Sequence, residues 1–314
     1  DLSNHTMRLV PNATGDGYTV GTGGTFSAPP GRLTPLALGD DATVGVPLPA
    51  PLHYPNGSTS ILSVCSNGFV SELHGNGDDP TPLTSAWLGS MFTRWGTWCD
   101  FDPAAAGSGG VKYHVLGSVA YVTWDGVYRH GTTSPSTWQL QFDTQTGIVT
   151  FVWQTMSTVG GPVLVGYTAG GTNVDLGSFD LSRQLGATFP VGPRNRIPLQ
   201  LDAVAQPMGS ASTFTVRNYD SSGNVGILRL SGYPLGPVID LGPFGMPTCS
   251  MYVGPGPSIV MIANASRLTT YSANIPYIPG LAGMPINAQA FAFAPGANAM
   301  GAVSSNGVQL ILGF

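Results

Sequence analysis

Residues 138–153 have the sequence WQLQFDTQTGIVTFVW, and this stretch decides the fold class. Apolar side chains alternate with polar ones as far as Phe142, residues 144–147 turn the chain, and the alternation resumes at Val149. A period of two with one polar face is typical of an antiparallel pair of strands half buried against a core. The sequence therefore predicts a β-hairpin here.

The composition extends this prediction to the whole chain. Only 9% of the residues are charged, with Lys112 the single lysine and Glu72 the single glutamate, whereas there are 44 glycines and 27 prolines. Lysine and glutamate favour helices, and glycine and proline interrupt them. Even the longest stretch without glycine or proline, residues 258–275, lacks a helical stripe and is predicted as strand and loop. We therefore expect an all-β protein of antiparallel, sandwich-like domains.

At 314 residues the chain exceeds the usual size of one domain. Residues 1–36 are polar and rich in glycine and proline, which predicts an extended N-terminal arm with one strand over residues 1–10. A first β domain over 37–191 and a second over 192–314 are predicted, divided by the composition shift at residues 189–193. Such an arm is ordered only if it docks, either on its own domains or on a neighbouring copy.

Charge and hydropathy exclude two classes of partner. The net charge is −5 without a basic stripe, so no nucleic-acid partner is expected. No apolar run approaches the roughly 20 residues of a membrane helix, so no membrane span is predicted. The chain begins with Asp1 rather than Met, from which we expect a processed N-terminus and a secreted protein, although a chain start of another origin would look the same.

The three cysteines, Cys65, Cys99 and Cys249, do not form a CxxC pair, so a structural zinc site is not expected. In a secreted protein the expected disulfide joins Cys65 to Cys99, which would stabilise the fold by about 4 kcal/mol in the chain-entropy model. Cys249 is then either a small buried apolar residue, the favoured interpretation, or one half of an intermolecular bridge.

No catalytic residue and no cofactor is predicted. The chain lacks the Gly-x-Ser-x-Gly element of serine hydrolases. A triad that is dispersed in the sequence, or the paired carboxylates of a glycosidase, stays an alternative. Many aspartates lie beside turn-forming residues, which favours a role in turns. The histidines are scattered along the sequence: His5, His53, His74, His114 and His130.

Metal and sugar sites are weighed against structural roles. Calcium prefers carboxylate oxygens from loops, but surface turns are the favoured interpretation and no metal is predicted. Core packing is favoured over a sugar platform for most tryptophans, whereas Trp95 and Trp98 are left open between the two. The calcium alternatives are Asp40 with Asp41, Asp78 with Asp79, and Asp100 with Asp102. The platform alternative comprises Trp87, Trp95, Trp98 and Trp124, and the favoured core residues are Trp124, Trp138 and Trp153.

Five segments, in order and spacing, resemble the nidogen-type extracellular domain over roughly residues 40–180. They are VCSNGFV at 64–70, WCDFD at 98–102, YVTWDGV at 121–127, TWQLQF at 137–142 and VGYTAG at 165–170. This resemblance implies an extracellular domain of the kind found in matrix and adhesion proteins, without catalytic residues.

The second domain resembles a C-terminal β-module of secreted proteins from planctomycete-type bacteria. The matching pieces are GMPTC at 245–249, IP at 275–276 leading to LAG at 281–283, NAQA at 287–290 and SSNGVQLILG at 304–313. That resemblance implies secretion and no particular activity.

Together these features predict a non-enzymatic extracellular structural or adhesive protein that associates with copies of itself. A fibre or surface-layer subunit that uses its N-terminal arm to add a strand to a neighbour's sheet is one form this would take. The alternatives are a monomeric module that binds a glycan or a cell-surface protein, and a secreted polymer hydrolase.

Overall fold

The computed structural model confirms the all-β prediction. Strands make up almost all of the regular structure, and the described residues contain a single α-helix, α1 (Thr84–Leu88). Three 3-10 turns, η1 (Leu181–Arg183), η2 (Gly242–Phe244) and η3 (Pro279–Leu281), complete it. None of the helices described is long and apolar enough to cross a bilayer. The structure describes residues 1–31, 33–55, 57–73, 80–161, 163–171, 173, 175–192, 197–233, 239–247 and 249–313.

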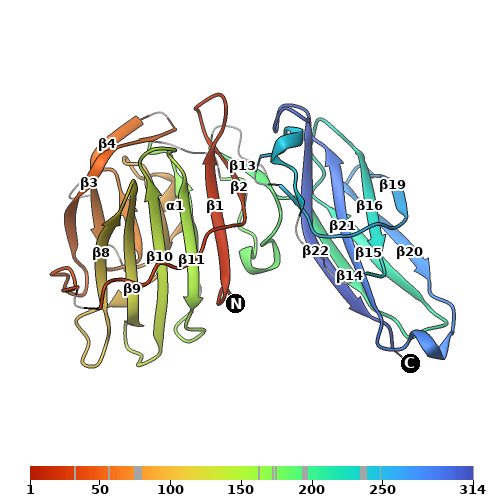
Figure 1. Ribbon diagram of the computed structural model, residues 1–314, viewed down its shortest axis with the longest axis horizontal. Coiled ribbons are helices and arrows are strands. Elements are labelled where there is room, and N and C mark those ends of the chain that lie inside the picture. The colour runs from red at the N-terminus through yellow and green to blue at the C-terminus, as the bar shows by residue number, and fades with distance from the viewer. Residues whose placement is uncertain are drawn as a thin grey trace. The chain divides into compact units, whose positions relative to one another are not determined.

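The chain folds as two compact units, each built from facing antiparallel sheets (Figure 1). The first unit comprises Asp1–Tyr18, Gly23–Ser182 and Val191–Pro193, and the second comprises Thr19–Thr22, Arg183–Pro190 and Arg194–Phe314. The boundary expected after residue 191 lies within the interval in which the chain changes unit. The assignment of residues 19–22 to the second unit has no counterpart in the sequence pattern.

The larger sheet of the first unit contains the predicted hairpin. Its two strands, β10 and β11, place Trp138 opposite Trp153 and Leu140 opposite Phe151, so the apolar face is continuous across the pair. The sheet has the order β13-β2-β1-β11-β10-β9-β7, with β8 on β9. Most residues of β2 and β13 are assigned to the second unit, and the other strands belong to the first. The bounds are β1 (His5–Pro11), β2 (Tyr18–Gly21), β7 (Phe101–Asp102), β8 (Gly110–Leu116), β9 (Val119–Arg129), β10 (Pro135–Asp143), β11 (Val149–Thr155) and β13 (Phe189–Val191).

A five-stranded sheet of order β12-β6-β5-β4-β3 faces the larger one. Two buried indoles link the sheets through hydrogen bonds. Trp153 Nε1 donates to Thr97 Oγ1 at 3.0 Å, and Trp124 Nε1 donates to the carbonyl oxygen of Ser66 at 2.9 Å. The bounds are β3 (Thr43–Tyr54), β4 (Gly57–Cys65), β5 (Phe69–Ser71), β6 (Arg94–Trp98) and β12 (Leu164–Thr168).

The N-terminal segment docks on its own chain, which was one of the two alternatives. Strand β1 pairs with β11, and its inward side chains Met7 and Leu9 are 5% and 1% exposed. Residues 23–31 then cross the outer face of the same sheet (Figure 1). Gln139 Nε2 donates to the carbonyl oxygen of Ser27 at 2.8 Å, and Gln141 Nε2 donates to that of Thr25 at 2.7 Å. These bonds explain why a polar segment is ordered.

The expected disulfide between Cys65 and Cys99 is wrong: none of the cysteines, all of which lie among the described residues, forms a disulfide. Cys65 packs against Trp98, the residue that precedes Cys99, together with Phe69 and Trp87. Cys99 instead directs its sulfur toward the carbonyl oxygen of Asp100. The packing of large aromatic rings around Cys65 takes the place of a covalent link.

The second unit is a smaller sandwich. A three-stranded sheet, β14-β15-β20, faces a four-stranded sheet, β19-β16-β21-β22, and a short pair, β17 and β18, lies in the connection between β16 and β19. Its core joins Phe214 and Val216 of the first sheet to Leu228 and a row of alanines on the second. The bounds are β14 (Gln200–Val204), β15 (Ala211–Arg217), β16 (Val225–Ser231), β17 (Ile239–Asp240), β18 (Ser250–Met251), β19 (Ser258–Ile262), β20 (Leu268–Asn274), β21 (Pro285–Phe293) and β22 (Ala302–Ile311).

All six tryptophans lie in the first unit, so their fluorescence reports on that unit alone. We expect Leu9→Ala to lower the free energy of unfolding of the first unit by about 2–5 kcal/mol, because it leaves a cavity beneath β1. Urea unfolding followed by tryptophan fluorescence measures this. Arg8→Ala, on the opposite face of the same strand, is the control and should cost much less. Equal losses in the two variants would contradict the docking of β1.

Reducing agent should leave the urea midpoint of the first unit unchanged, because Cys65 and Cys99 are buried thiols. A disulfide at this spacing would instead make reduction cost about 4 kcal/mol. The measurement compares unfolding with and without dithiothreitol, and Cys65→Ala, which removes a packed side chain, serves as the positive control for a loss of stability. A fall of the midpoint on reduction of the unmodified chain would argue for a covalent bond.

Candidate functional site

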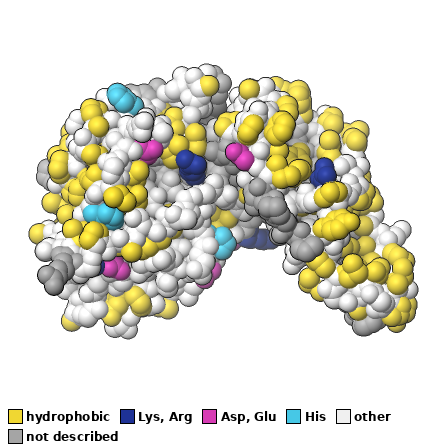
Figure 2. All heavy atoms as spheres, in the orientation of Figure 1, with side chains coloured by type: hydrophobic (Ala, Val, Ile, Leu, Met, Phe, Trp, Pro, Cys, Tyr) yellow, Lys and Arg dark blue, Asp and Glu magenta, His cyan; other side chains and the backbone are white. Residues whose placement is uncertain are grey.

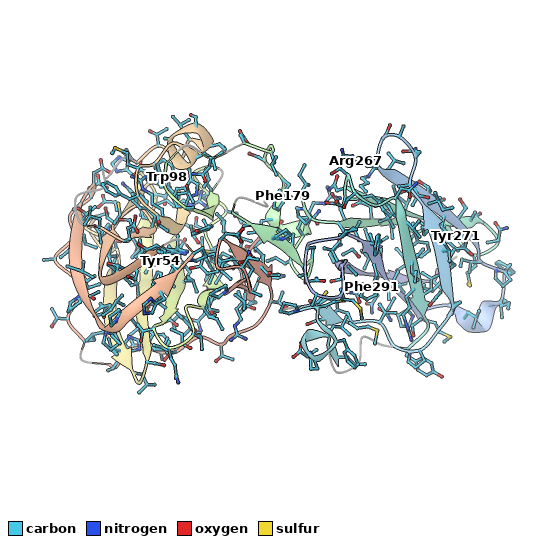
Figure 3. The ribbon with its side chains drawn as sticks, turned by 90° about the horizontal axis from the view of Figure 1, so that it is seen from above. Tyr54, Trp98, Phe179, Arg267, Tyr271 and Phe291 are labelled. Carbon is cyan, nitrogen blue, oxygen red and sulfur yellow. The ribbon has the colours of Figure 1, made fainter. Side chains whose placement is uncertain are left out.

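The tryptophans that the sequence left open as a sugar platform are core residues. All six are 3% exposed or less. Trp124 and Trp138 stack with ring centroids 4.1 Å apart, and Trp98 lies against Phe69 at 5.8 Å in the interior of the first unit (Figure 3). Because neither Trp95 nor Trp98 reaches the surface, the platform alternative is wrong for both.

The histidines do not converge on a catalytic group in the part of the chain that the structure describes. His5 and His53 are exposed, and His114 stacks on Tyr121 with centroids 4.7 Å apart. Burial lowers the pKa of His114. Among the described histidines, His130 is the one that lies within 4.0 Å of carboxylate oxygens. His74, like Asp78 and Asp79, lies outside the described residues.

Two of the aspartate pairs considered for calcium meet in one cluster. Asp40 and Asp41 lie just before β3, whereas Asp100 and Asp102 lie at β7, a strand that pairs with the end of β9. Asn67 joins the two loops, because its Nδ2 donates to Asp41 Oδ1 at 2.7 Å while its Oδ1 accepts the N–H of Phe101 at 3.0 Å. Two distant loops are thereby held side by side.

His130, which follows β9, completes this acidic cluster. Its Nδ1 lies 3.2 Å from Asp40 Oδ2 and 4.0 Å from Asp102 Oδ2. Ligand-type atoms of Asp40, Asp102 and His130 lie within 4.8 Å of one another, and so do those of Asp40, Asp41 and Asp100. Carboxylates in such loops are the residues that can hold a hard cation. In the absence of a cation, the same geometry makes the carboxylates repel one another.

The repulsion is visible in the pKa of two members. Burial, followed by repulsion from Asp102, raises the pKa of Asp40, while the nearby His130 counteracts this. Burial raises the pKa of Asp100 as well, and Asp40, Asp41 and Asp102 add to the shift. A carboxyl group with a raised pKa in the folded state favours folding at low pH. That contribution is fully present below the unfolded-state pKa and is lost as the pH rises through the folded-state pKa.

We expect Asp40→Asn to raise the free energy of unfolding near pH 7, because it removes one of the mutually repelling charges. The gain should stay below about 1 kcal/mol, since the Asp40 side chain is 39% exposed and solvent screens it. The gain should disappear at about pH 3, where an ordinary carboxyl group is protonated. Urea unfolding by tryptophan fluorescence at the two pH values measures this. A loss of stability near pH 7 would show that the Asp40 charge is favourable.

An open hollow of about 430 Å³ lies in the first unit beside the chain's one lysine. Lys112 Nζ contacts Asp125 Oδ2 at 2.7 Å, and both residues line the hollow along with Leu36, Leu38 and Pro103. The Lys112 ammonium group is paired with the Asp125 carboxylate. The lysine therefore contributes neither an unpaired cation nor a free amine base to the hollow.

The second unit has a different kind of surface feature, on the outer face of the sheet β19-β16-β21-β22. Register places Val225 opposite Ile262 and Ile227 opposite both Val260 and Phe291. Successive strand residues point to opposite faces, and the neighbours Leu228, Met261 and Ala292 are the ones buried in the core. The outward side chains Val225, Ile227, Val260, Ile262 and Phe293 are between 44% and 68% exposed.

The other half of this outer face is covered by the connection between β16 and β19. Gln289, which lies opposite Arg229, accepts the N–H of Tyr252 at 2.9 Å and donates from Nε2 to the carbonyl oxygen of Ser250 at 2.9 Å. Arg229 Nε donates to the carbonyl oxygen of Gly254 at 3.0 Å. The face is therefore divided into a covered polar half and a bare apolar half.

The other sheet of the same unit is mostly polar on its outer face, where Val204 is an exposed apolar exception. Thr215 and Thr270 lie opposite each other with their hydroxyl oxygens 3.2 Å apart. Arg217 Nε donates to Asp202 at 3.3 Å, and Arg183 contacts the same carboxylate. The phenylalanine and tyrosine labelled in the second unit in Figure 3, Phe291 and Tyr271, belong to the apolar-faced and the polar-faced sheet respectively. Polar residues therefore occupy most exposed strand positions of the sheet β14-β15-β20. In the bare half of the sheet β19-β16-β21-β22, apolar residues occupy the corresponding positions.

The sequence pattern did not predict the bare apolar half of this face. Val260 and Met261 are consecutive apolar residues, and such runs are typical of strands buried on both faces. This run of apolar residues therefore indicates that both faces of β19 are covered, but it does not indicate what covers the outer one.

No family model, curated protein or solved structure matches this chain. The resemblance of residues 40–180 to the nidogen-type domain and that of the C-terminal segments to the bacterial module stay predictions.

Proposed function

We propose that the protein is a non-enzymatic, extracellular structural or adhesive component that assembles from copies of the same chain. One observation carries the proposal, namely that large apolar side chains gather at the surface of the second unit. In Figure 2 they cover much of the drawn face of this unit, with few charged side chains among them. Besides the outer-face residues of the four-stranded sheet, they include Tyr233, Phe244, Tyr277, Ile278, Met300 and Ile311.

Exposing this much apolar surface to water is unfavourable in free energy, and contact with another protein would remove it from water. The low charge of the chain favours a further copy as that protein. Only 9% of the residues are charged and the net charge is −5, so copies repel one another weakly and offer little for a partner that recognises charge.

The N-terminal segment is not needed as a free arm in this proposal. Strand β1 pairs with β11 on one side and with β2 on the other. Thr25 and Ser27 are held by Gln141 and Gln139 of the same chain. Exchange of β1 between copies remains compatible with assembly, because the same pairing can form between two chains. The exposed apolar residues of the second unit offer a contact that needs no such rearrangement.

The alternative interpretation, a monomeric glycan-binding module, is no longer supported by surface tryptophans. That interpretation relied on Trp95 and Trp98 at the surface, and both side chains are buried. The proposals of an extracellular location and of a non-enzymatic role both rest on what the two sequence resemblances imply.

Sedimentation velocity and electron microscopy of the full chain at micromolar concentration should reveal assemblies larger than one chain. Because apolar contact drives the association, the assemblies should persist at about 1 M salt, where charge interactions are screened within about 3 Å. They should weaken on cooling, because hydrophobic stabilisation falls with temperature. A chain that stays monomeric at every concentration, or an assembly that salt dissolves, would contradict the proposal.

A further inference from the structure

The bare half of the outer sheet face is one continuous surface. We call Val225, Ile227, Val260, Ile262, Phe291 and Phe293 the apolar patch. Its members come from three adjacent strands, β19, β16 and β21, and cross-strand register brings them into neighbouring rows. None of the six carries a charge.

The patch is large enough to form the centre of a stable interface. The exposed fractions of its five most exposed members correspond to about 500 Å² of accessible surface, backbone atoms included, which is within the range of the largest apolar patches on monomeric proteins. A stable complex buries about 800 Å² on each partner, with an apolar centre and a polar rim. The patch supplies that centre, and the surrounding polar side chains supply the rim.

The shape of the patch favours another sheet as its occupant. An extended peptide added beside the edge strand β19 would cover one row of side chains. The patch is three strands wide, and neighbouring strands lie about 4.8 Å apart. Apolar faces of two sheets pack against each other about 10 Å apart, with their side chains interdigitated. A second copy of the same patch offers such a face with the same width and the same lack of charge.

We propose that the apolar patch is a two-fold symmetric interface, through which two copies of the chain pack sheet against sheet. This inference rests on the proposed self-assembly and specifies the surface that carries it. A surface that pairs with itself closes at two chains, so the patch makes a dimer, and any longer assembly grows from dimers through other surfaces. The segment that covers Gln289 limits how far the partner's sheet can extend across the face.

The test compares matched charge substitutions on two edge strands of the same unit. Val260→Lys and Ile262→Lys place a charge in the patch, at positions 68% and 66% exposed, so little packing within the chain is lost. Thr270→Lys places the same charge on β20, at the polar outer face of the other sheet. Light scattering coupled to size exclusion and sedimentation equilibrium give the mass and the dimer dissociation constant.

We expect the unmodified chain and Thr270→Lys to dimerise alike. Each patch variant should raise the dimer dissociation constant at least about tenfold, because two-fold symmetry buries the new charge twice without a partner. Circular dichroism and thermal unfolding of the monomer verify the fold. If a lysine variant fails to fold, Val260→Thr keeps the branched side-chain shape and should weaken the dimer in the same direction by a smaller factor.

The possible failures separate this inference from the proposed function. An assembly that survives Val260→Lys and Ile262→Lys in correctly folded chains would overturn the patch as the interface and leave self-assembly standing. If the unmodified chain associates into an open-ended series of oligomers without a discrete dimer at low concentration, and the patch variants abolish that association, the two-fold symmetry is overturned. Equal weakening by Thr270→Lys would overturn the assignment to this face. An unmodified chain that is always monomeric would overturn both proposals.

Discussion

The pairing of strands whose side chains alternate between two faces is the constraint on which this molecule depends. In the first unit it aligns Trp138 with Trp153 and Leu140 with Phe151 on one face of the larger sheet. A row of rings on one face must be covered, and the five-stranded sheet covers it with side chains such as Trp95, whose ring lies 5.6 Å from that of Phe142. Trp98 lies on the other face of that sheet, where it packs with Phe69 and Trp87. Burial of these aromatic side chains stabilises the unit without a disulfide, so its thiols can remain buried packing residues.

Because side chains alternate, every sheet also has an outer face that points away from the core. The residues that occupy or cover this outer face differ between the two units. In the first unit, residues 23–31 lie over part of the outer face, and Thr25 and Ser27 among them bond to Gln141 and Gln139. In the second unit, threonines fill the outer face of one sheet, while the other sheet is half covered by its own connection and half bare. A bare apolar face costs free energy in water, and a contact between chains is the simplest way to remove that cost.

The acidic cluster follows from topology rather than from any single stretch of sequence. The two aspartate pairs are separated by about sixty residues, and they meet because β7 pairs with β9 while Asn67 binds both loops. The sequence indicated the oxygen ligands of each pair, but it could not bring Asp40 and His130 together. Their proximity depends on strand pairings that are not local.

The sequence by itself determined the all-β class, the β10–β11 hairpin and the strand character of residues 258–275, because these follow from alternation and from glycine and proline content. Only the tertiary structure decided that Trp95 and Trp98 are buried, that Cys65 and Cys99 do not bond, and that Val260 faces outward beside the buried Met261. Alternation fixes which side chains share a face. Which face a second layer covers depends on contacts between residues far apart in the chain, and local pattern does not encode them.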